Sequence, residues 1–352
     1  MGIPPAAGGE GAITGADRDT LLDLLFDHRA DVIREFLRER ECPVSGTKAE
    51  LRDRISGFVD DGTIPATDLV DLLDEVEGWG NQHIYLYRAP AEADALKEWA
   101  TADSAVAILR RHKLDHLFNR RRRLVLPPSR EMVTVEWSER QVRFVWVEGR
   151  VWRERRPDLD RREEPEAVDR FDAPAGVPRS LLFDAYEEFH GRGIIAFEFD
   201  LVSGLAGLFI QRLEAGNNYS AVREQLIEEL QPLVNARQFT PIRVGRSIVH
   251  LESEPGVRRR QIEHTTERGS RINYVSSERG QDAFSDPTLE QARRGAGARV
   301  VGRLGNFYWR LPDEEREIHV KLYAADQRVG LFGEYSEQEV RYVLRRIRKY
   351  CR

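Results

Sequence analysis

The first folded stretch of the chain shows a helical pattern of apolar positions. Asp17 belongs to a residue type that favours the N-cap of a helix, and apolar residues recur after it at intervals of three to four. Residues 42–46, which include a proline and a glycine, interrupt the pattern because neither residue continues a helix cheaply. The apolar positions before the interruption are Leu21, Leu22, Leu24, Leu25, Phe26, Val32, Ile33, Phe36 and Leu37.

Two more helices and a strand are predicted after this interruption. Thr47 followed by Glu50 three positions later forms a capping-box pattern at the start of a helix. A turn at residues 60–62 leads to a further helix over residues 66–76. Residues 83–87 then alternate like a short strand. The helix that starts at Thr47 carries the apolar residues Leu51, Ile55 and Phe58.

The period of the pattern changes in the middle of the chain. Residues 91–118 are predicted to be helical, and a run of four arginines follows at residues 120–123. Residues 154–178 are charged, contain proline and lack a period, so they predict a loop or linker. Between these segments apolar residues recur at every second position, which predicts an antiparallel meander: Val133, Val135, Trp137, Val142, Phe144, Trp146 and Val151.

Two distant segments follow the same order of elements. Residues 194–233 and residues 318–350 each read as strand, turn, strand and helix, with a Tyr-Ser pair where the helix would be capped. Either a structural duplication or a chance similarity explains this shared order of elements. Strands and helices alternate through this part of the chain, which predicts an α+β fold with helices packed on a mainly antiparallel sheet.

The length of 352 residues fits two or three domains. We expect a disordered leader over residues 1–16 and a helical domain over residues 17–90. A basic helical connector is expected over residues 91–128, followed by the α+β domain over residues 129–352. The predicted fold is therefore an N-terminal helical bundle followed by a sheet domain.

The composition predicts a soluble protein of the cell interior. Apolar residues make up 41% of the chain and charged residues 32%. No run approaches the ~20 consecutive apolar residues of a transmembrane helix, and residues 1–16 lack the features of a secretory signal. The only two cysteines, Cys42 and Cys351, are too few for a disulfide framework or a zinc cluster. We therefore predict a cytoplasmic protein without membrane contact.

The charge is unevenly distributed along the chain. The net charge is −6, and residues 17–80 hold 17 acidic and 8 basic residues. Residues 81–352 carry a net charge of +4. Contacts with a polyanion are therefore expected from the later segments, or from one local face of the first helical domain.

The segment of residues 31–55 carries the clearest motif. Its first helix has Val32, Phe36 and Leu37 at apolar positions, and a Pro-Val-Ser-Gly-Thr-Lys loop follows at residues 43–48. The second helix continues with Ala49, Glu50, Leu51, Arg54 and Ile55. Along essentially its full length this segment resembles the SAP motif, a helix–loop–helix family that binds duplex DNA.

The residue types of the loop suit a phosphate group. Gly46 permits a tight turn, Thr47 leaves free N–H groups at a helix N-terminus, and Lys48 places a cation beside them. The alternative is a well-capped turn in a helical bundle, which the acidic neighbours of the loop favour. The SAP resemblance implies DNA contact by Ser45, Gly46, Thr47, Lys48 and Arg52.

The layout of the chain has a second resemblance. A helical first domain, a basic connector and then a strand meander are similar to the order of elements in the kinetochore centromere protein N family. The residues that carry the similarity are 133–137 and 145–147, which lie where that family begins the sheet of its second domain. The resemblance implies nucleoprotein binding by the first domain and connector, and heterodimerisation through the C-terminal sheet.

Basic clusters are the next candidates for contacts with phosphate. The connector contributes two clusters, which can either contact phosphate or form a solvated face paired with acidic residues. Residues 258–260 and the last helix, with Arg345, Arg346, Arg348 and Lys349, are further candidates. The DNA-binding residues predicted in the connector are Arg110, Arg111, Lys113, Arg120, Arg121, Arg122 and Arg123.

Patterns for catalysis are weaker. His112 and His116 have the spacing of a zinc pair, but a third ligand and the usual glutamate are missing. A Gly-Arg-Gly sequence at residues 191–193 reads as a short turn and no phosphate loop is present. A nuclease could bind metal ions with acidic and basic residues on two strands, which here would be Glu198, Asp200, Glu317, His319 and Lys321. The solvent-exposed face of a sheet also explains polar residues at these alternating positions.

These observations together predict a non-catalytic protein that binds double-stranded DNA through a SAP-like module and a basic connector. The C-terminal domain would bind a protein partner or a second copy of the chain, and the protein would associate with the nucleoid. No catalytic residue, metal or cofactor is predicted. One alternative is a protein-interaction scaffold without a nucleic-acid role, and another is a metal-dependent nuclease or defence effector.

Overall fold

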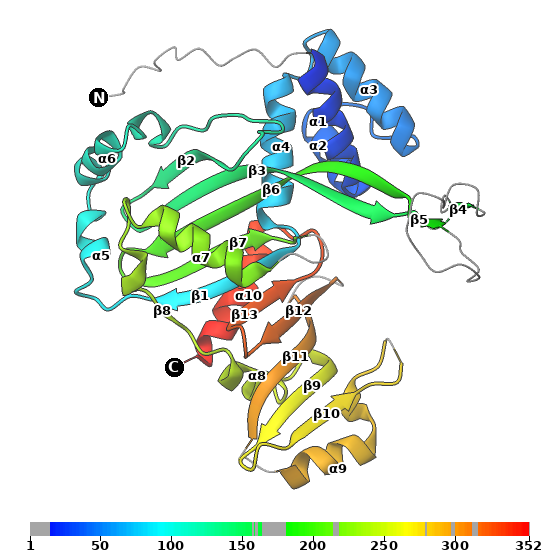
Figure 1. The fold of residues 1–352 in the computed structure, drawn as a ribbon, viewed down its shortest axis with the longest axis vertical. Helices are drawn as coiled ribbons and strands as arrows, with labels where there is room; N and C mark the ends of the chain where they lie inside the picture. The colour runs from blue at the N-terminus through cyan, green and yellow to red at the C-terminus, as the bar shows by residue number, and fades with distance from the viewer. Residues whose placement is uncertain are drawn as a thin grey trace, which may run out of the picture.

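A computed structural model describes residues 15–156, 158, 161–163, 181–213, 218–278, 280–296, 300–311 and 316–351. The chain combines helices with one large antiparallel sheet, so the predicted mixed fold class is confirmed at this level. Figure 1 shows the helices of the N-terminal segment at one end of the sheet and strands β9 and β10 at the other. Of the predicted leader, only residues 15 and 16 are described, and they begin the first helix.

Four helices precede the sheet, and they are α1 (Gly15–Asp27), α2 (Ala30–Glu39), α3 (Lys48–Asp60) and α4 (Ala66–Trp79). The predicted capping box is present, because the Thr47 side chain accepts a hydrogen bond from the Glu50 N–H and the Glu50 carboxylate accepts one from the Thr47 N–H. Most of the apolar residues that the sequence pattern identified lie together in one buried cluster, whereas Val32 is half-buried outside it. Its members include Leu21, Leu25, Ile33, Phe36, Leu37, Leu51, Ile55, Leu69, Val70 and Leu73.

The sheet contains strands from both the N-terminal and the C-terminal parts of the chain. Its order is β10-β9-β11-β12-β13-β1-β7-β6-β3-β2, with β8 paired to β1. The strands are β1 (Gln82–Arg88), β2 (Glu131–Trp137), β3 (Gln141–Arg155), β6 (Tyr186–Asp200), β7 (Leu205–Gln211), β8 (Thr240–Pro241), β9 (Val257–Thr266), β10 (Arg271–Val275), β11 (Val300–Arg310), β12 (Glu317–Tyr323) and β13 (Arg328–Leu331).

Strand β1 is central in this sheet. It pairs with β13 on one side and with β7 on the other, both antiparallel. The sequence pattern grouped residues 83–87 with the first helical domain, whereas the structure shows them joining the two halves of the sheet. Local periodicity identifies a strand but not its partners, because the partners come from residues more than 100 positions away.

The remaining helices lie around the sheet. The predicted connector helix is divided into α5 (Asp94–Glu98), α6 (Ala102–Arg111) and the 3-10 turn η1 (Asp115–Leu117). The others are α7 (Tyr219–Leu230), η4 (Ala236–Gln238), α8 (Gly245–Leu251), η5 (Ala283–Ser285), α9 (Pro287–Ala296) and α10 (Glu337–Lys349). The connector is interrupted because Thr101 caps α6 with its side chain and thereby starts a new helix there.

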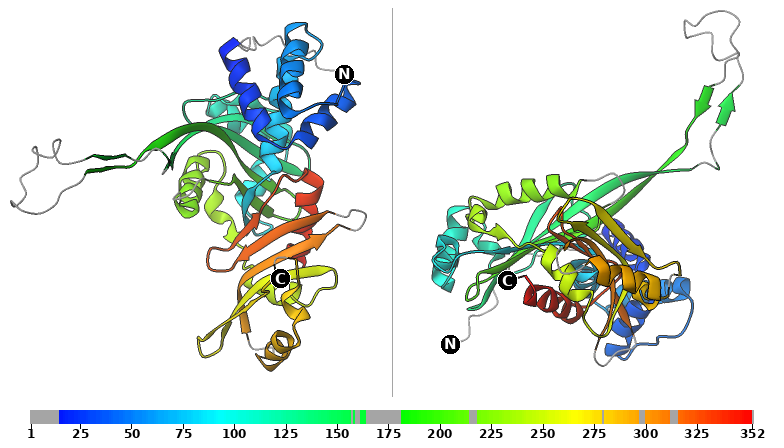
Figure 2. Two further views of the ribbon diagram at one scale, coloured as in Figure 1. Left: turned by 90° about the vertical axis from the view of Figure 1, so that its right-hand side faces the viewer. Right: turned by 90° about the horizontal axis from the view of Figure 1, so that it is seen from below.

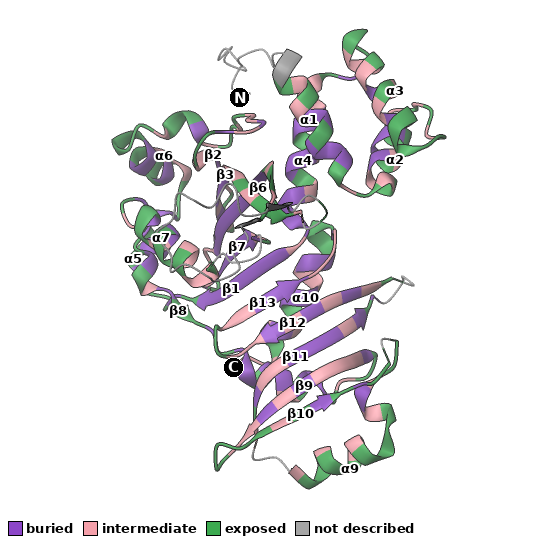
Figure 3. Ribbon diagram, turned by 45° about the vertical axis from the view of Figure 1, so that its right-hand side comes forward, coloured by how far each residue is buried: buried purple, intermediate pink, exposed green. Residues whose placement is uncertain are grey.

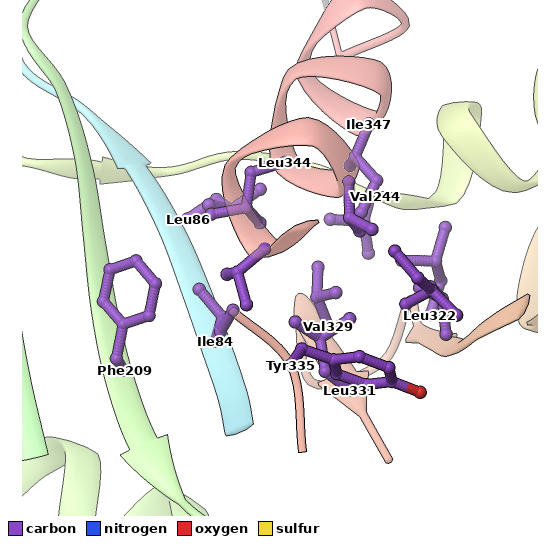
Figure 4. Packing of buried hydrophobic residues seen from close by; sticks show 14 of the residues in the cluster. Ile84, Leu86, Phe209, Val244, Leu322, Val329, Leu331, Tyr335, Leu344 and Ile347 are labelled. Carbon is purple, nitrogen blue, oxygen red and sulfur yellow. The ribbon is translucent and has the colours of Figure 1, made fainter. Parts of the chain in front are cut away.

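Helices cover both faces of the first half of the sheet. On one face Phe144 and Phe197 pack among residues of α5, α6 and α7. On the other face Ile84 and Phe209 pack with Trp79 of α4 and with residues of α10. Figure 4 shows Leu344 and Ile347 of α10 beside Leu86 and Val244 within this core.

In the second half, α8 and α10 cover one face, where Phe307, Val320 and Val329 are buried. Figure 3 shows the opposite face of β9, β11 and β12 without a helix in front of it. One face of this half of the sheet is therefore open in the described part of the chain.

The hairpin of β3 and β6 extends beyond the sheet. Their pairing runs from Gln141–Asp200 to Arg155–Tyr186, and Figure 2 shows the far end projecting from the body of the molecule. The short strands β4 (Arg161–Glu163) and β5 (Leu181–Phe183) pair beyond it. Most of the loop predicted over residues 154–178 lies outside the described residues.

The two segments with similar sequence order have the same elements. Residues 194–233 contain the end of β6, then β7 and α7, and residues 318–350 contain β12, β13 and α10. Ser336 caps α10 in a capping box. The cap of α7 is Asn218, one residue before the expected Tyr-Ser pair, because its side chain accepts hydrogen bonds from two N–H groups of the first turn.

Candidate nucleic-acid interface

The loop between α2 and α3 is the most exposed part of the N-terminal helices. Every residue from Ser45 to Glu50 is exposed. Gly46 has φ +123°, a region that favours glycine, and a Cβ atom at this position would lie 2.9 Å from the Glu50 carboxylate. The loop therefore requires glycine for its backbone conformation and for the close approach of the Glu50 side chain.

Two arginines hold the backbone of this loop. Arg34 donates a hydrogen bond to the Gly46 carbonyl at 3.1 Å. Arg54 donates to the carbonyls of Pro43 and Ser45, both at 2.9 Å. These bonds orient the loop carbonyls toward the helices and place two guanidinium groups directly behind the loop.

The cations of the loop are not neutralised by ion pairs. Among the described residues, no carboxylate forms an ion pair with Arg34, Lys48 or Arg54. Lys48 is exposed at the first position of α3. Three positive charges therefore lie around one exposed loop of an otherwise acidic segment. A local face of this kind was one of the two alternatives that the charge distribution left open.

Glu50 opposes this positive charge. Its carboxylate accepts a hydrogen bond from the Thr47 N–H at 2.6 Å, and hydrogen bonds to Thr47 lower the pKa of Glu50. The capping box uses the N–H groups of Thr47 and Glu50. The capping box does not use the N–H groups of Lys48 and Ala49, which are therefore free to donate to an acceptor outside the helix.

The other predicted loop contact, Arg52, is directed elsewhere. It forms an ion pair with Asp23 of α1, so its guanidinium lies against the helices. Of the five residues that the SAP resemblance implies, Ser45, Gly46, Thr47 and Lys48 are together at the exposed loop.

The arginine run of the connector contacts carboxylates of neighbouring elements. Arg121 lies 2.6 Å from Asp74 of α4, and Arg122 lies 3.2 Å from Glu131 of β2. Arg123 pairs with Asp71 of α4 through two hydrogen bonds of 3.0 Å. The anions that compensate these three arginines are therefore side chains of the protein, and they fasten the connector to α4 and β2. Arg120 is exposed.

The basic cluster at the end of α6 is on the surface. Arg110 lies 3.8 Å from Asp115, and Arg111, His112, Lys113 and His116 are exposed. Figure 1 shows α6 and α3 on opposite sides of α4, so the structure does not bring this cluster next to the loop. In the described part of the chain, no group of three or more His, Cys, Asp or Glu residues is placed to hold a metal ion.

The candidate nuclease residues each have a structural contact. Glu198 forms two hydrogen bonds with Arg341, and Asp200 accepts hydrogen bonds from the N–H groups of residues 202 and 203. Glu317 pairs with Arg258, and His319 lies 2.7 Å from the side-chain oxygen of Asn306. Lys321 lies over the ring of Phe332 at 5.0 Å. The two strands therefore do not bring these residues together as one ligand set.

The arginines of residues 258–260 are also engaged. Arg258 pairs with Glu317, and Arg259 pairs with Asp282 at 2.7 Å. Arg260 donates hydrogen bonds to the carbonyls of Ser276 and Glu278. These contacts hold β9 to its neighbours, which accounts for the cluster without a phosphate ligand.

A buried network of charges joins the N-terminal helices to the sheet. Arg192 of β6 is fully buried and pairs with Asp74 and Glu77 of α4, the latter at 2.9 Å. His28, between α1 and α2, lies 4.0 Å from Glu77 and 3.1 Å from Glu334, which precedes α10. Burial raises the pKa of Glu77 to about 7, against the opposing charges of Arg192 and His28.

This network is not predicted by the sequence pattern. The Gly-Arg-Gly sequence at residues 191–193 was expected to be a turn, but it lies inside β6. Gly191 is needed because a Cβ atom there would lie 2.9 Å from the ring of Trp152. An arginine between two glycines in an apolar strand is the one local sign of a buried charge, and its partners are not visible in the sequence.

No protein-family model and no curated protein matches this chain. Among the described residues, no helix is both long enough and apolar enough to cross a lipid bilayer.

Proposed function

We propose that this chain binds duplex DNA without catalysis, and that the loop of residues 43–48 contacts the phosphate backbone. The observation that carries the proposal is the group of three cations, Arg34, Lys48 and Arg54, that surround an exposed loop and lack carboxylate partners among the described residues. Cations beside free helix N–H groups suit a phosphate oxygen, and Glu50, whose carboxylate interacts with Arg54, offsets part of their charge. Contacts of this kind position a protein on DNA without reading its sequence.

The acidic remainder of the first four helices does not prevent this contact. Electrostatic attraction between exposed charges is screened over about 8 Å at physiological salt, so the nearest charges dominate. Most arginines elsewhere in these helices are neutralised, as Arg40 is by Asp68 and Arg52 by Asp23. We assign the helices α1–α4 to a SAP-like bundle on this basis.

The contribution of the connector is smaller than the sequence predicts. The connector forms ion pairs with carboxylates through Arg121, Arg122 and Arg123. Breaking these ion pairs would cost free energy, and contacts with DNA would have to compensate that cost. The exposed residues Arg111, Lys113 and Arg120 remain as auxiliary contacts in the proposal. The proposed location of the protein is the cytoplasm, on the nucleoid.

The open sheet face favours a role in protein contact as a second function. We define it by Tyr308, His319, Lys321 and Tyr323. The ring of Tyr308 stacks on that of His319 with centroids 4.5 Å apart, and the Arg328 guanidinium lies 4.4 Å from the centroid of Tyr323. Tyrosine is enriched in protein interfaces, so this face suits a protein partner or a second copy of the chain. Light scattering of the purified chain over a concentration series tests self-association.

Reversing the charge of Lys48 is expected to weaken binding to a labelled 30-bp duplex by about fivefold or more, because the variant no longer neutralises one phosphate and repels its neighbours. The slope of log affinity against log salt concentration should fall by about 0.9 for each phosphate that is no longer neutralised. Fluorescence anisotropy of the wild type and Lys48→Glu across a salt titration measures both quantities.

The matched control is Lys97→Glu, which makes the same charge change at an exposed lysine of α5. This control should bind like the wild type. A wild-type protein that fails to bind the duplex at low salt would rule out the proposed function. Equal affinities of the wild type and Lys48→Glu would instead show that the loop does not contact the DNA.

A further inference from the structure

The last helix carries a row of cations on its outer side. Val340, Leu344 and Ile347 of α10 are buried against the sheet, whereas Arg345 and Lys349 are exposed and Arg348 is half-buried. Arg348 and Lys349 follow Arg345 by three and four positions, so both are neighbours of Arg345 on the helix surface. Like charges at this spacing destabilise a helix by a few tenths of a kcal/mol per pair.

Two more cations come from elements next to this end of α10, because the Ile242 N–H donates to the Leu86 carbonyl of β1 and Val244 packs beside Ile347. Arg88 ends β1, and Arg243 lies between β8 and α8. The charges of Arg348 and Arg88 both act on the thiol of Cys351, whose pKa burial raises and these charges lower. Helix α8 is also adjacent, because the Ser247 hydroxyl donates to the Ile347 carbonyl at 3.2 Å. We name Arg88, Arg243, Arg345, Arg348 and Lys349 the C-terminal basic cluster.

The carboxylates that face this part of α10 already have partners. Glu198 binds Arg341, Asp200 binds Arg140 and two backbone N–H groups, and Glu254 binds Arg346 at 3.0 Å. In the part of the chain that the structure describes, no carboxylate forms an ion pair with a member of the C-terminal basic cluster. The Nε of Arg348 is buried and lacks a hydrogen-bond partner there.

The helix macrodipole explains only part of this arrangement. It favours cations in the last turn of a helix, which accounts for Arg348 and Lys349. It does not account for Arg88 and Arg243, which come from other elements.

We propose that the C-terminal basic cluster is a second binding surface for the phosphate backbone of duplex DNA, separate from the loop of residues 43–48. This inference rests on the proposed function in one respect, because its ligand is duplex DNA. It does not require that the loop of residues 43–48 contacts the DNA. Figure 2 shows α10 on the outside of the molecule, on the same side of the sheet as α3 in the view from below. Four of these cations, Arg88, Arg243, Arg345 and Lys349, are exposed and form no ion pair among the described residues, so phosphate groups can serve as their counter-charges. Arg348 lies behind them, where the charges of Glu198 and Asp200 act on it.

The test reverses the two most exposed charges of the cluster. Arg345→Glu/Lys349→Glu is expected to lower affinity for the 30-bp duplex on the order of tenfold or more at 50 mM salt and to reduce the salt slope by about 1.8. The same loss should occur when Lys48→Glu is also present, because the two surfaces make separate phosphate contacts. The milder Arg345→Gln/Lys349→Gln should give a smaller loss, with an unchanged melting temperature showing that α10 is still folded.

The matched control is Arg268→Glu/Arg271→Glu, which reverses two exposed arginines at the hairpin of β9 and β10 and should leave affinity unchanged. If the α10 variant binds like the wild type while Lys48→Glu binds weakly, the inference is overturned and the proposed loop contact stands. If the α10 variant loses affinity while Lys48→Glu does not, the cluster stands and the loop contact is removed. Equal losses in the α10 variant and the control would show a general effect of net charge and would also overturn the inference.

Discussion

Replacing Arg192 by methionine is expected to lower the free energy of unfolding by about 3 to 5 kcal/mol, which is the usual cost of removing one partner of a buried ion pair. Arg192 is fully buried and is the shared partner of Asp74 and Glu77. Its guanidinium also donates to the Leu124 carbonyl at 2.9 Å, so methionine leaves three acceptors with fewer partners. Urea denaturation at constant pH measures the change.

The control for this variant is Arg153→Met on the projecting hairpin. Arg153 pairs with Glu188, but its side chain is 70% exposed, so water solvates the Glu188 carboxylate when the guanidinium is removed. An exposed pair of this kind contributes about 1 kcal/mol or less. A loss of stability at Arg192 no larger than that at Arg153 would show that the buried network does not join the N-terminal helices to the sheet energetically.

The pH dependence of stability is expected to change by about 2 to 3 kcal/mol between pH 5 and pH 8 when Glu77 is replaced by glutamine. The pKa of Glu77 is raised to about 7 in the folded chain, from the 4.5 of an unperturbed glutamate. Between these two values the folded state binds more protons at Glu77 than the unfolded state does. The wild type should therefore lose stability as the pH rises from about 4.5 to about 7, and Glu77→Gln should lack this loss.

Urea denaturation of both proteins at several pH values between 5 and 8 measures the difference. Subtracting the curve of Glu77→Gln from that of the wild type removes the contributions of groups that do not interact with Glu77. The control for the substitution itself is Glu188→Gln, which makes the same change at an exposed carboxylate of the projecting hairpin. Parallel curves for the wild type and Glu77→Gln would show that Glu77 has no raised pKa.

The N-terminal helices show how far local signals reach. Thr47 and Glu50 predicted the start of α3 because a capping box involves residues only three positions apart. The apolar positions of α1, α2 and α3 were found from their spacing, and most of them lie together in one core. The DNA-binding role of the loop stays a prediction, although the structure places its four residues together on an exposed turn.

The connector shows where a charge pattern is ambiguous. A run of four arginines requires anions, and the sequence leaves open whether they are phosphates or carboxylates. Asp71, Asp74 and Glu131 supply carboxylates from elements that are distant in the sequence. The last helix differs, because Arg345 and Lys349 form no ion pair among the described residues.

The sequence by itself determined the capped start of α3, the helical period of the N-terminal segment and the two-residue period of β2 and β3, because each depends on neighbours within a few positions. Only the tertiary structure decided that β1 is the central strand, and that Arg192 meets Asp74 across 118 positions of sequence. Such pairings follow from how the sheet brings distant strands together, and side-chain periodicity contains no information on which distant residues will meet.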